Sequence, residues 1–72
     1  MPQKVARVGR SGTDGRWWMQ LSGQTTFEAF NDFDDMPDFA RVRLAILLTA
    51  PSGFRDERIG RRIAEDAFWL FY

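Results

Sequence analysis

Carboxylate side chains are concentrated between residues 28 and 38, where their type and spacing suggest metal binding. The acidic residues of this segment are Glu28, Asp32, Asp34, Asp35 and Asp38. Carboxylate oxygens are the ligands that Ca²⁺ and Mg²⁺ prefer. A calcium loop that starts at Asp32 would have Asp34 in its third position, but Pro37 takes the sixth position, where the loop requires glycine, and no glutamate closes it. The spacing therefore excludes a calcium loop and leaves open a magnesium site held by two of the carboxylates.

Two other interpretations of the acidic segment need no metal. Asp34, Asp35 and Asp38 lie where a helix is expected to begin, and negative charge there complements the helix dipole and keeps the surface soluble. We prefer this interpretation, which predicts no bound metal and no cofactor. In the other interpretation, the segment docks a basic partner, and we keep Asp32, Asp34 and Asp35 as candidate partner-binding residues.

The chain has few of the side chains that acid–base or nucleophilic catalysis requires. Histidine and cysteine are absent, so the usual general base near pH 7 is missing. Ser11, Ser22 and Ser52 have no activating neighbour in the sequence, and Lys4 is the only lysine. Paired carboxylates can hydrolyse glycosides, but a domain of 72 residues leaves little room for a substrate cleft. We therefore expect no enzymatic activity and no catalytic residues.

Aromatic residues and arginines are abundant, and both are enriched at the hot spots of protein–protein contacts. Aromatic residues make up 15% of the chain. The candidate partner-binding residues outside the acidic segment are Arg16, Trp18, Arg61, Trp69 and Phe71. We predict a non-enzymatic protein-binding domain, an adaptor or inhibitor that occupies the surface of a partner protein, of the kind expected of a bacterial or bacteriophage accessory protein.

Single-stranded nucleic acid is the alternative partner. A sheet that presents Trp18 and Trp69 among Arg7, Arg16 and Arg61 would offer a platform on which unpaired bases stack. Affinity for phosphates depends on accumulated positive charge, and here ten basic residues are offset by ten acidic ones. The basic residues lie near both ends of the chain and the acidic segment lies between them. We therefore rank a protein partner above nucleic acid.

Length and composition indicate one domain, residues 1–72. Hydrophobic residues make up 44% of the chain and charged residues 28%, which is typical of a folded globule. The absence of cysteine favours an intracellular setting, the cytoplasm of a bacterium or of a phage-infected host cell. No signal-peptide pattern is present. The central apolar run, 44–50, is far shorter than the roughly 20 residues that cross a bilayer, so we expect no membrane association.

The first third of the chain predicts an antiparallel hairpin. Residues 4–10 carry β-branched side chains, and residues 16–22 alternate with a period of two, which puts Trp17 and Trp18 on opposite faces. The Asp-Gly dipeptide between the two segments is a strong hairpin signal.

The next segment predicts a short helix. Thr25 and Glu28 match a capping box, and a helix that starts there would carry Phe27, Phe30 and Phe33 along one stripe. The run of Asn and Asp that follows would end this helix, because these side chains compete for backbone hydrogen bonds.

A second helix is expected to open at Pro37, whose missing N–H costs nothing at that position. It ends near residue 50, before a Pro-Ser-Gly sequence. Its apolar face, which includes Phe39, Val42 and Ile46, is broad enough to imply burial on more than one side.

Two interpretations remain open for residues 56–66. Charged pairs four residues apart favour a helix, but Gly60 would destabilise it by about 1 kcal/mol. We prefer strands at 58–62 and 67–72 joined by a turn. The predicted fold is a small α+β domain, β-β-α-α-β-β, with a four-stranded antiparallel sheet and a helical segment on one face. An N-terminal hairpin followed by two or three helices is the alternative.

The last strand is apolar on both of its faces. Phe68, Leu70 and Tyr72 share one face, and Trp69 and Phe71 belong to the other. A sheet covered on one side buries only one of these sets. The second set is covered either by the far end of the helical segment or by another molecule, which would be a partner protein or a second copy of this chain. We also predict a homo-oligomer through the C-terminal strand.

Overall fold

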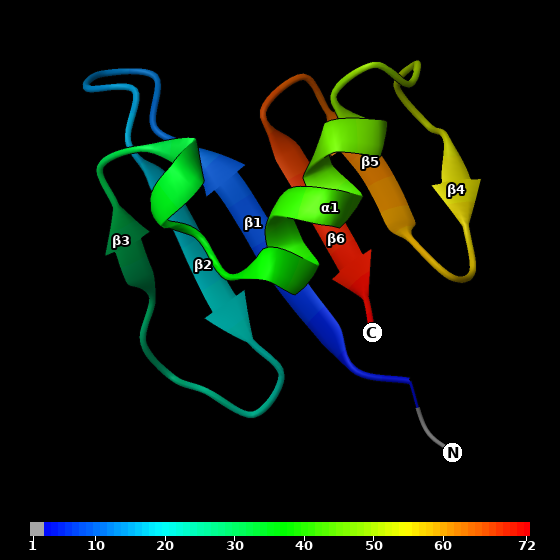
Figure 1. Ribbon diagram of the computed structural model, residues 1–72, viewed down its shortest axis with the longest axis horizontal. Coiled ribbons are helices and arrows are strands. Elements are labelled where there is room, and N and C mark those ends of the chain that lie inside the picture. The colour runs from blue at the N-terminus through cyan, green and yellow to red at the C-terminus, as the bar shows by residue number, and fades with distance from the viewer. Residues whose placement is uncertain (1–2) are drawn as a thin grey trace.

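The computed structural model describes residues 3–72 and consists of one antiparallel sheet with a single α-helix packed on it (Figure 1). The strands are β1 (Val5–Arg10), β2 (Trp17–Leu21), β3 (Glu28–Phe30), β4 (Arg55–Asp56), β5 (Gly60–Ala64) and β6 (Ala67–Phe71), and the helix is α1 (Asp38–Leu47). A 3-10 turn, Phe33–Asp35, precedes the helix. The order across the sheet is β3-β2-β1-β6-β5-β4. Within residues 3–72, no helix is long and apolar enough to cross a membrane.

The predicted N-terminal hairpin is confirmed. In the β1–β2 ladder, Val8 pairs with Met19 and Gly9 pairs with Trp18. Because paired residues share a face and successive residues alternate, Trp17 and Trp18 point to opposite sides of the sheet. Trp17 is buried in the core, as the period of two requires.

Strands, rather than a helix, form the last third of the chain, as we preferred. β6 lies between β1 and β5 and pairs with both, so the last strand is central in the sheet. Gly60 begins β5 with a φ of 149°, and its α-carbon lies so close to the backbone oxygen of Trp69 that a β-carbon would overlap it. The glycine that argues against a helix is therefore the residue that this strand pair requires.

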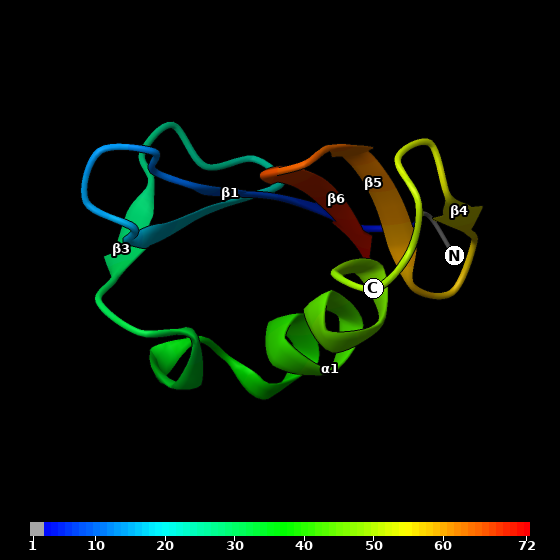
Figure 2. The ribbon, with the colours of Figure 1, turned by 90° about the horizontal axis from the view of Figure 1, so that it is seen from above.

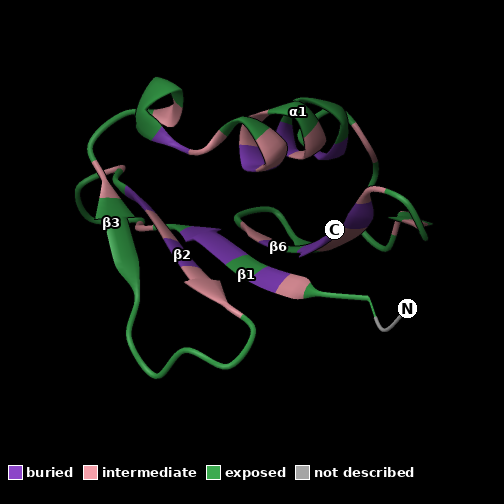
Figure 3. Cartoon of the chain, turned by 60° about the horizontal axis from the view of Figure 1, so that its bottom comes forward, coloured by how far each residue is buried: buried purple, intermediate pink, exposed green. Residues whose placement is uncertain are grey.

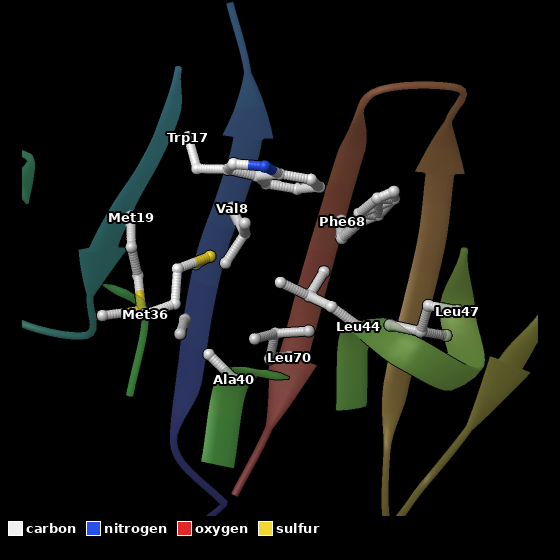
Figure 4. Close-up of a cluster of buried hydrophobic side chains, with 10 residues drawn as sticks. Val8, Trp17, Met19, Met36, Ala40, Leu44, Leu47, Phe68 and Leu70 are labelled. Atoms are coloured by element: carbon white, nitrogen blue, oxygen red, sulfur yellow. The ribbon is translucent and has the colours of Figure 1, made fainter. Parts of the chain in front are cut away.

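The core lies between the sheet and α1, which packs on one face only (Figures 2 and 4). Its buried side chains are Ala6, Val8, Trp17, Met19, Met36, Ala40, Leu44, Leu47, Phe68 and Leu70. Trp17 packs against Phe68 at 6.3 Å and against Phe33 of the 3-10 turn at 5.7 Å between ring centroids. The 3-10 turn and α1 thus extend the cover of the same sheet face.

Both predicted versions of the fold are wrong, because the sheet has six strands instead of four and there is one α-helix instead of two or three. The expected helix from Thr25 does not form. Residues 28–30 pair instead with β2, where Phe30 lies opposite Trp17 and Ala29 opposite Trp18. Strand pairing places Phe30 beside the core. A stripe of three aromatics in a short segment gives a helix little stability without tertiary packing.

The N-terminal cap lies further along the chain than expected, at Asp32, directly before the 3-10 turn. The backbone N–H of Asp32 donates to the carboxylate of Asp35 at 3.3 Å. The second additional strand, β4, pairs with β5 through only two residues, Arg55 and Asp56. A segment of that length carries no periodicity from which a strand could be predicted.

A helix forms where the second helix was predicted, but it is shorter: Pro37 lies directly before its first residue, Asp38, and it ends at Leu47 and not near residue 50. The prediction that this helix is buried on more than one side is wrong, because Val42 is 61% exposed and Ile46 is 43% exposed. Val42 and Ile46, two residues of the expected apolar face, therefore lie largely in solvent. Phe39, the third, packs against Tyr72 at the end of the chain, with 4.5 Å between ring centroids.

Candidate binding surface on the uncovered face of the sheet

One face of the sheet is covered by α1 and the 3-10 turn, and no element covers the opposite face in the part of the chain that the structure describes (Figures 2 and 3). The register of the strands assigns residues to this uncovered side, because they alternate with the buried core residues. We call it the open face. Its outward strand positions include Val5, Arg7, Gly9, Trp18, Gln20, Ala29, Arg55, Arg61, Ala67, Trp69 and Phe71, with Phe27 beside Trp18.

Trp18 is held by its two neighbours on the open face. Gly9 is its partner on β1, and a β-carbon at position 9 would overlap the indole ring, so the ring lies across the glycine. Phe27 packs edge-on against the indole, with ring centroids 5.1 Å apart and an interplanar angle of 75°. Phe27 itself is 58% exposed. The pair forms an aromatic surface of fixed geometry.

Trp69 stands at the centre of a row that crosses the strands. The register places Gln20, Arg7, Trp69, Arg61 and Arg55 side by side, one on each of β2, β1, β6, β5 and β4. We call this the cross-strand row. The indole of Trp69 is 40% exposed, and the Arg61 guanidinium lies over it, 5.9 Å from the ring centroid. Arg7 is the partner of Trp69 on the other side.

Phe71 and Arg55 lie at the margin of the row. Phe71 is only 5% exposed, and the Arg55 guanidinium lies over its ring at 5.5 Å. Arg55 also forms an ion pair with Glu57, at 3.0 Å between Nε and Oε1. The Phe71 ring therefore supports Arg55 and offers little surface of its own to a partner.

The charged side chains at the outward strand positions of the open face are all positive. Arg7, Arg55 and Arg61 occupy outward strand positions, whereas no outward strand position within residues 3–72 holds a carboxylate. Glu28 and Asp56 pair with Met19 and Gly60, which places both on the inner side. Arg7 and Arg61 therefore place positive charge on both sides of Trp69.

The acidic candidates lie elsewhere. Asp34 and Asp35 are exposed in the 3-10 turn on the covered side of the sheet, and Asp32, also exposed, is the N-cap of that turn. Across residues 3–72, no three carboxylates come together in a way that could hold a metal ion. Arg16 is exposed in the β1–β2 connection, where its backbone N–H donates to Asp14 at 3.0 Å. Of the predicted binding residues, the open face therefore unites Trp18, Arg61 and Trp69, with Phe71 on the same side but buried beneath Arg55.

Sequence reasoning missed Gly9, Phe27 and Arg55 as members of this surface, and it considered Arg7 only for nucleic acid. Gly9 carried a usable signal, because the hairpin register sets it opposite Trp18, where only a glycine leaves room for the ring. Phe27 had been assigned to a helix, and Arg55 lies in a strand too short to predict.

The described part of the chain contains no pocket. The open face therefore has no concave site of the kind that typically holds a small ligand. No protein-family model, no curated protein and no solved structure significantly matches this chain.

Proposed function

We propose that this protein is a non-enzymatic protein-binding domain, an adaptor or inhibitor that acts by covering a partner protein's surface with its open face. The observation that carries the proposal is the exposure of Trp69 (40%) and Phe27 (58%) on a sheet face that no other element covers. Large apolar side chains grouped on an uncovered face are typical of interaction sites. The cysteine-free composition supports an intracellular setting for this interaction.

The side chains of the open face are suited to serve as anchors. Tryptophan and arginine are the residue types most enriched at interface hot spots. Trp18 packs against Gly9 and Phe27, and the Arg61 guanidinium lies over the Trp69 ring, 5.9 Å from its centroid. Anchors that are already ordered lose little side-chain entropy on binding. A partner would therefore meet a preformed aromatic surface with arginines that orient it.

Single-stranded nucleic acid is the second candidate, and the separation of charge supports it. The acidic 3-10 turn lies across the sheet from the open face, so it does not neutralise Arg7 and Arg61 there. Arg55 is paired with Glu57, so Arg7 and Arg61 carry the positive charge that is left in the cross-strand row, and this keeps nucleic acid the second candidate. Few cations then remain to release counterions from a phosphate backbone.

Affinity capture from a lysate of the encoding organism tests the proposal. The wild-type protein is compared with Trp69→Ser on the open face and with Val42→Ser, a matched change at an exposed apolar residue on α1. We expect the same partner to be enriched by wild type and Val42→Ser and to be lost with Trp69→Ser. Equal capture by all three proteins would remove the open face as the contact surface.

A mobility-shift titration with a single-stranded oligonucleotide at low salt separates the two candidates. We expect no shift at tens of micromolar protein. A shift whose affinity falls steeply with added salt would instead assign the open face to nucleic acid.

A further inference from the structure

We infer that the segment bound by the open face is acidic, with two carboxylates about 10 Å apart and an apolar group between them that rests on Trp69. This inference rests on the proposed function and specifies the partner of the same surface. Its source is the cross-strand row, in which Trp69 lies directly between Arg7 and Arg61.

The spacing follows from the sheet. Arg7, Trp69 and Arg61 sit on three adjacent strands, β1, β6 and β5. Neighbouring strands are about 4.8 Å apart, so the two arginines stand about 10 Å apart across the tryptophan. A segment in the polyproline II conformation rises about 3.1 Å per residue with three residues per turn, so side chains three residues apart lie about 9 Å apart on the same side. Such a segment lying along the row would bring two carboxylates opposite Arg7 and Arg61, whose guanidinium groups bind carboxylates in a bidentate manner.

Charge complementarity selects this partner over a second copy of the chain. A symmetric dimer through the open face would bring the two arginine rows against each other, and like charges in contact are unfavourable. A second copy also cannot pair with the backbone of the C-terminal strand, because β6 already pairs with β1 on one side and with β5 on the other. An acidic segment neutralises Arg7 and Arg61, for which the structure gives no ion pair within residues 3–72.

Selection from a displayed library of random dodecapeptides tests the inference, with the whole protein as bait. We expect the enriched peptides to carry Asp or Glu at two positions three residues apart, with an apolar residue between them. The double variant Arg7→Glu with Arg61→Glu should bind the best peptide about tenfold more weakly or worse. A matched double variant, Arg16→Glu with Arg58→Glu, changes the charge equally at exposed residues off the row and should retain binding.

The outcomes separate this inference from the proposed function. Enriched peptides that are neutral or basic, and whose binding is lost with Trp69→Ser, would overturn the acidic partner and leave the protein-binding function intact. No enrichment over Trp69→Ser would overturn both. Binding of the oligonucleotide (dT)₁₂ that is lost with the Arg7 and Arg61 reversals would also overturn both. Circular dichroism melts identify any variant that fails to fold. The selection with the wild-type protein shows the charge preference by itself, so this result does not depend on the variants.

Discussion

The indole of Trp18 lies across Gly9 on the neighbouring strand, where any β-carbon would overlap it. This relationship links the local sequence to the candidate function. The hairpin register sets the smallest residue opposite one of the largest, and the ring therefore lies over the backbone of β1 with Phe27 at its edge. The aromatic surface that Trp18 and Phe27 form can exist only because residue 9 is a glycine.

Replacing Gly9 with alanine should disturb the open face and lower stability. The new methyl group must displace the Trp18 ring, and we expect a loss of about 1–3 kcal/mol in the free energy of unfolding. Urea denaturation followed by tryptophan fluorescence measures it. Gly12→Ala is the control, because nothing lies within 4 Å of a β-carbon there. Equal stability of the two variants would show that Trp18 does not occupy the space above Gly9.

Replacing Gly60 with alanine should be more damaging than the change at Gly9. A φ of 149° disfavours any residue with a β-carbon, and the added methyl group would overlap the backbone oxygen of Trp69, which cannot move aside as a side chain can. We expect a loss of roughly 3 kcal/mol or more. Thermal and urea unfolding measure the effect, and a variant as stable as wild type would refute the close β5–β6 contact.

Arg62 stabilises the end of α1 from a different part of the chain. Its Nη1 donates to the carbonyl oxygens of Leu48 at 3.1 Å and Ala50 at 2.6 Å. Arg62→Met keeps most of the apolar stem but removes these donors, and we expect a loss of about 1–3 kcal/mol. Urea unfolding is the measurement. Arg58→Met, at an exposed arginine in the β4–β5 turn, should change stability by less than about 0.5 kcal/mol.

The carboxylate of Asp14 makes the free energy of unfolding depend on pH in the acidic range. The backbone N–H of Arg16 donates to its carboxylate at 3.0 Å, and this bond, followed by one from the Ser11 hydroxyl, holds the pKa of Asp14 below its usual value of 3.8. A lowered folded-state pKa contributes stability that is present above pH 3.8 and is lost as the pH falls through the folded value. Wild type should therefore exceed Asp14→Ala in stability near pH 6.

The same comparison at low pH supplies the check. Urea denaturation repeated between pH 6 and pH 2 should show the advantage of wild type shrinking below about pH 4, as the carboxylate becomes protonated. An advantage that stays constant across this range would mean that the ionised form of Asp14 has no role in the turn.

The four middle strands of the sheet show how much of the fold the sequence could predict. Alternation over 16–22, an Asp-Gly turn and a two-faced apolar ending were enough to place β1, β2 and β6, and to divide the residues of β2 and β6 between two faces. β3 and β4 could not be found, because they are three and two residues long. Their strand state comes from pairing with β2 and β5, and not from their own propensity.

The candidate surface was predicted in part for a related reason. Trp18 and Trp69 follow from alternation alone, and both lie on the face that the period of two assigns to them. The alignment of Arg7, Trp69 and Arg61 depends on which strands are neighbours and in what register, which a single sequence does not contain. The acidic residues were grouped with them only because charge was counted along the chain and not across the sheet.

The central claim is that the open face, and not the helix face, contacts the partner. The three indole N–H signals in the NMR spectrum of the ¹⁵N-labelled protein test this most directly, because Trp18 and Trp69 belong to the open face while Trp17 is buried in the core as an internal control. On titration with the partner recovered by affinity capture, we predict that the Trp18 and Trp69 signals shift and that the Trp17 signal moves little. Unchanged Trp18 and Trp69 signals, with shifts confined to backbone amides around Val42 and Ile46 of α1, would contradict the account.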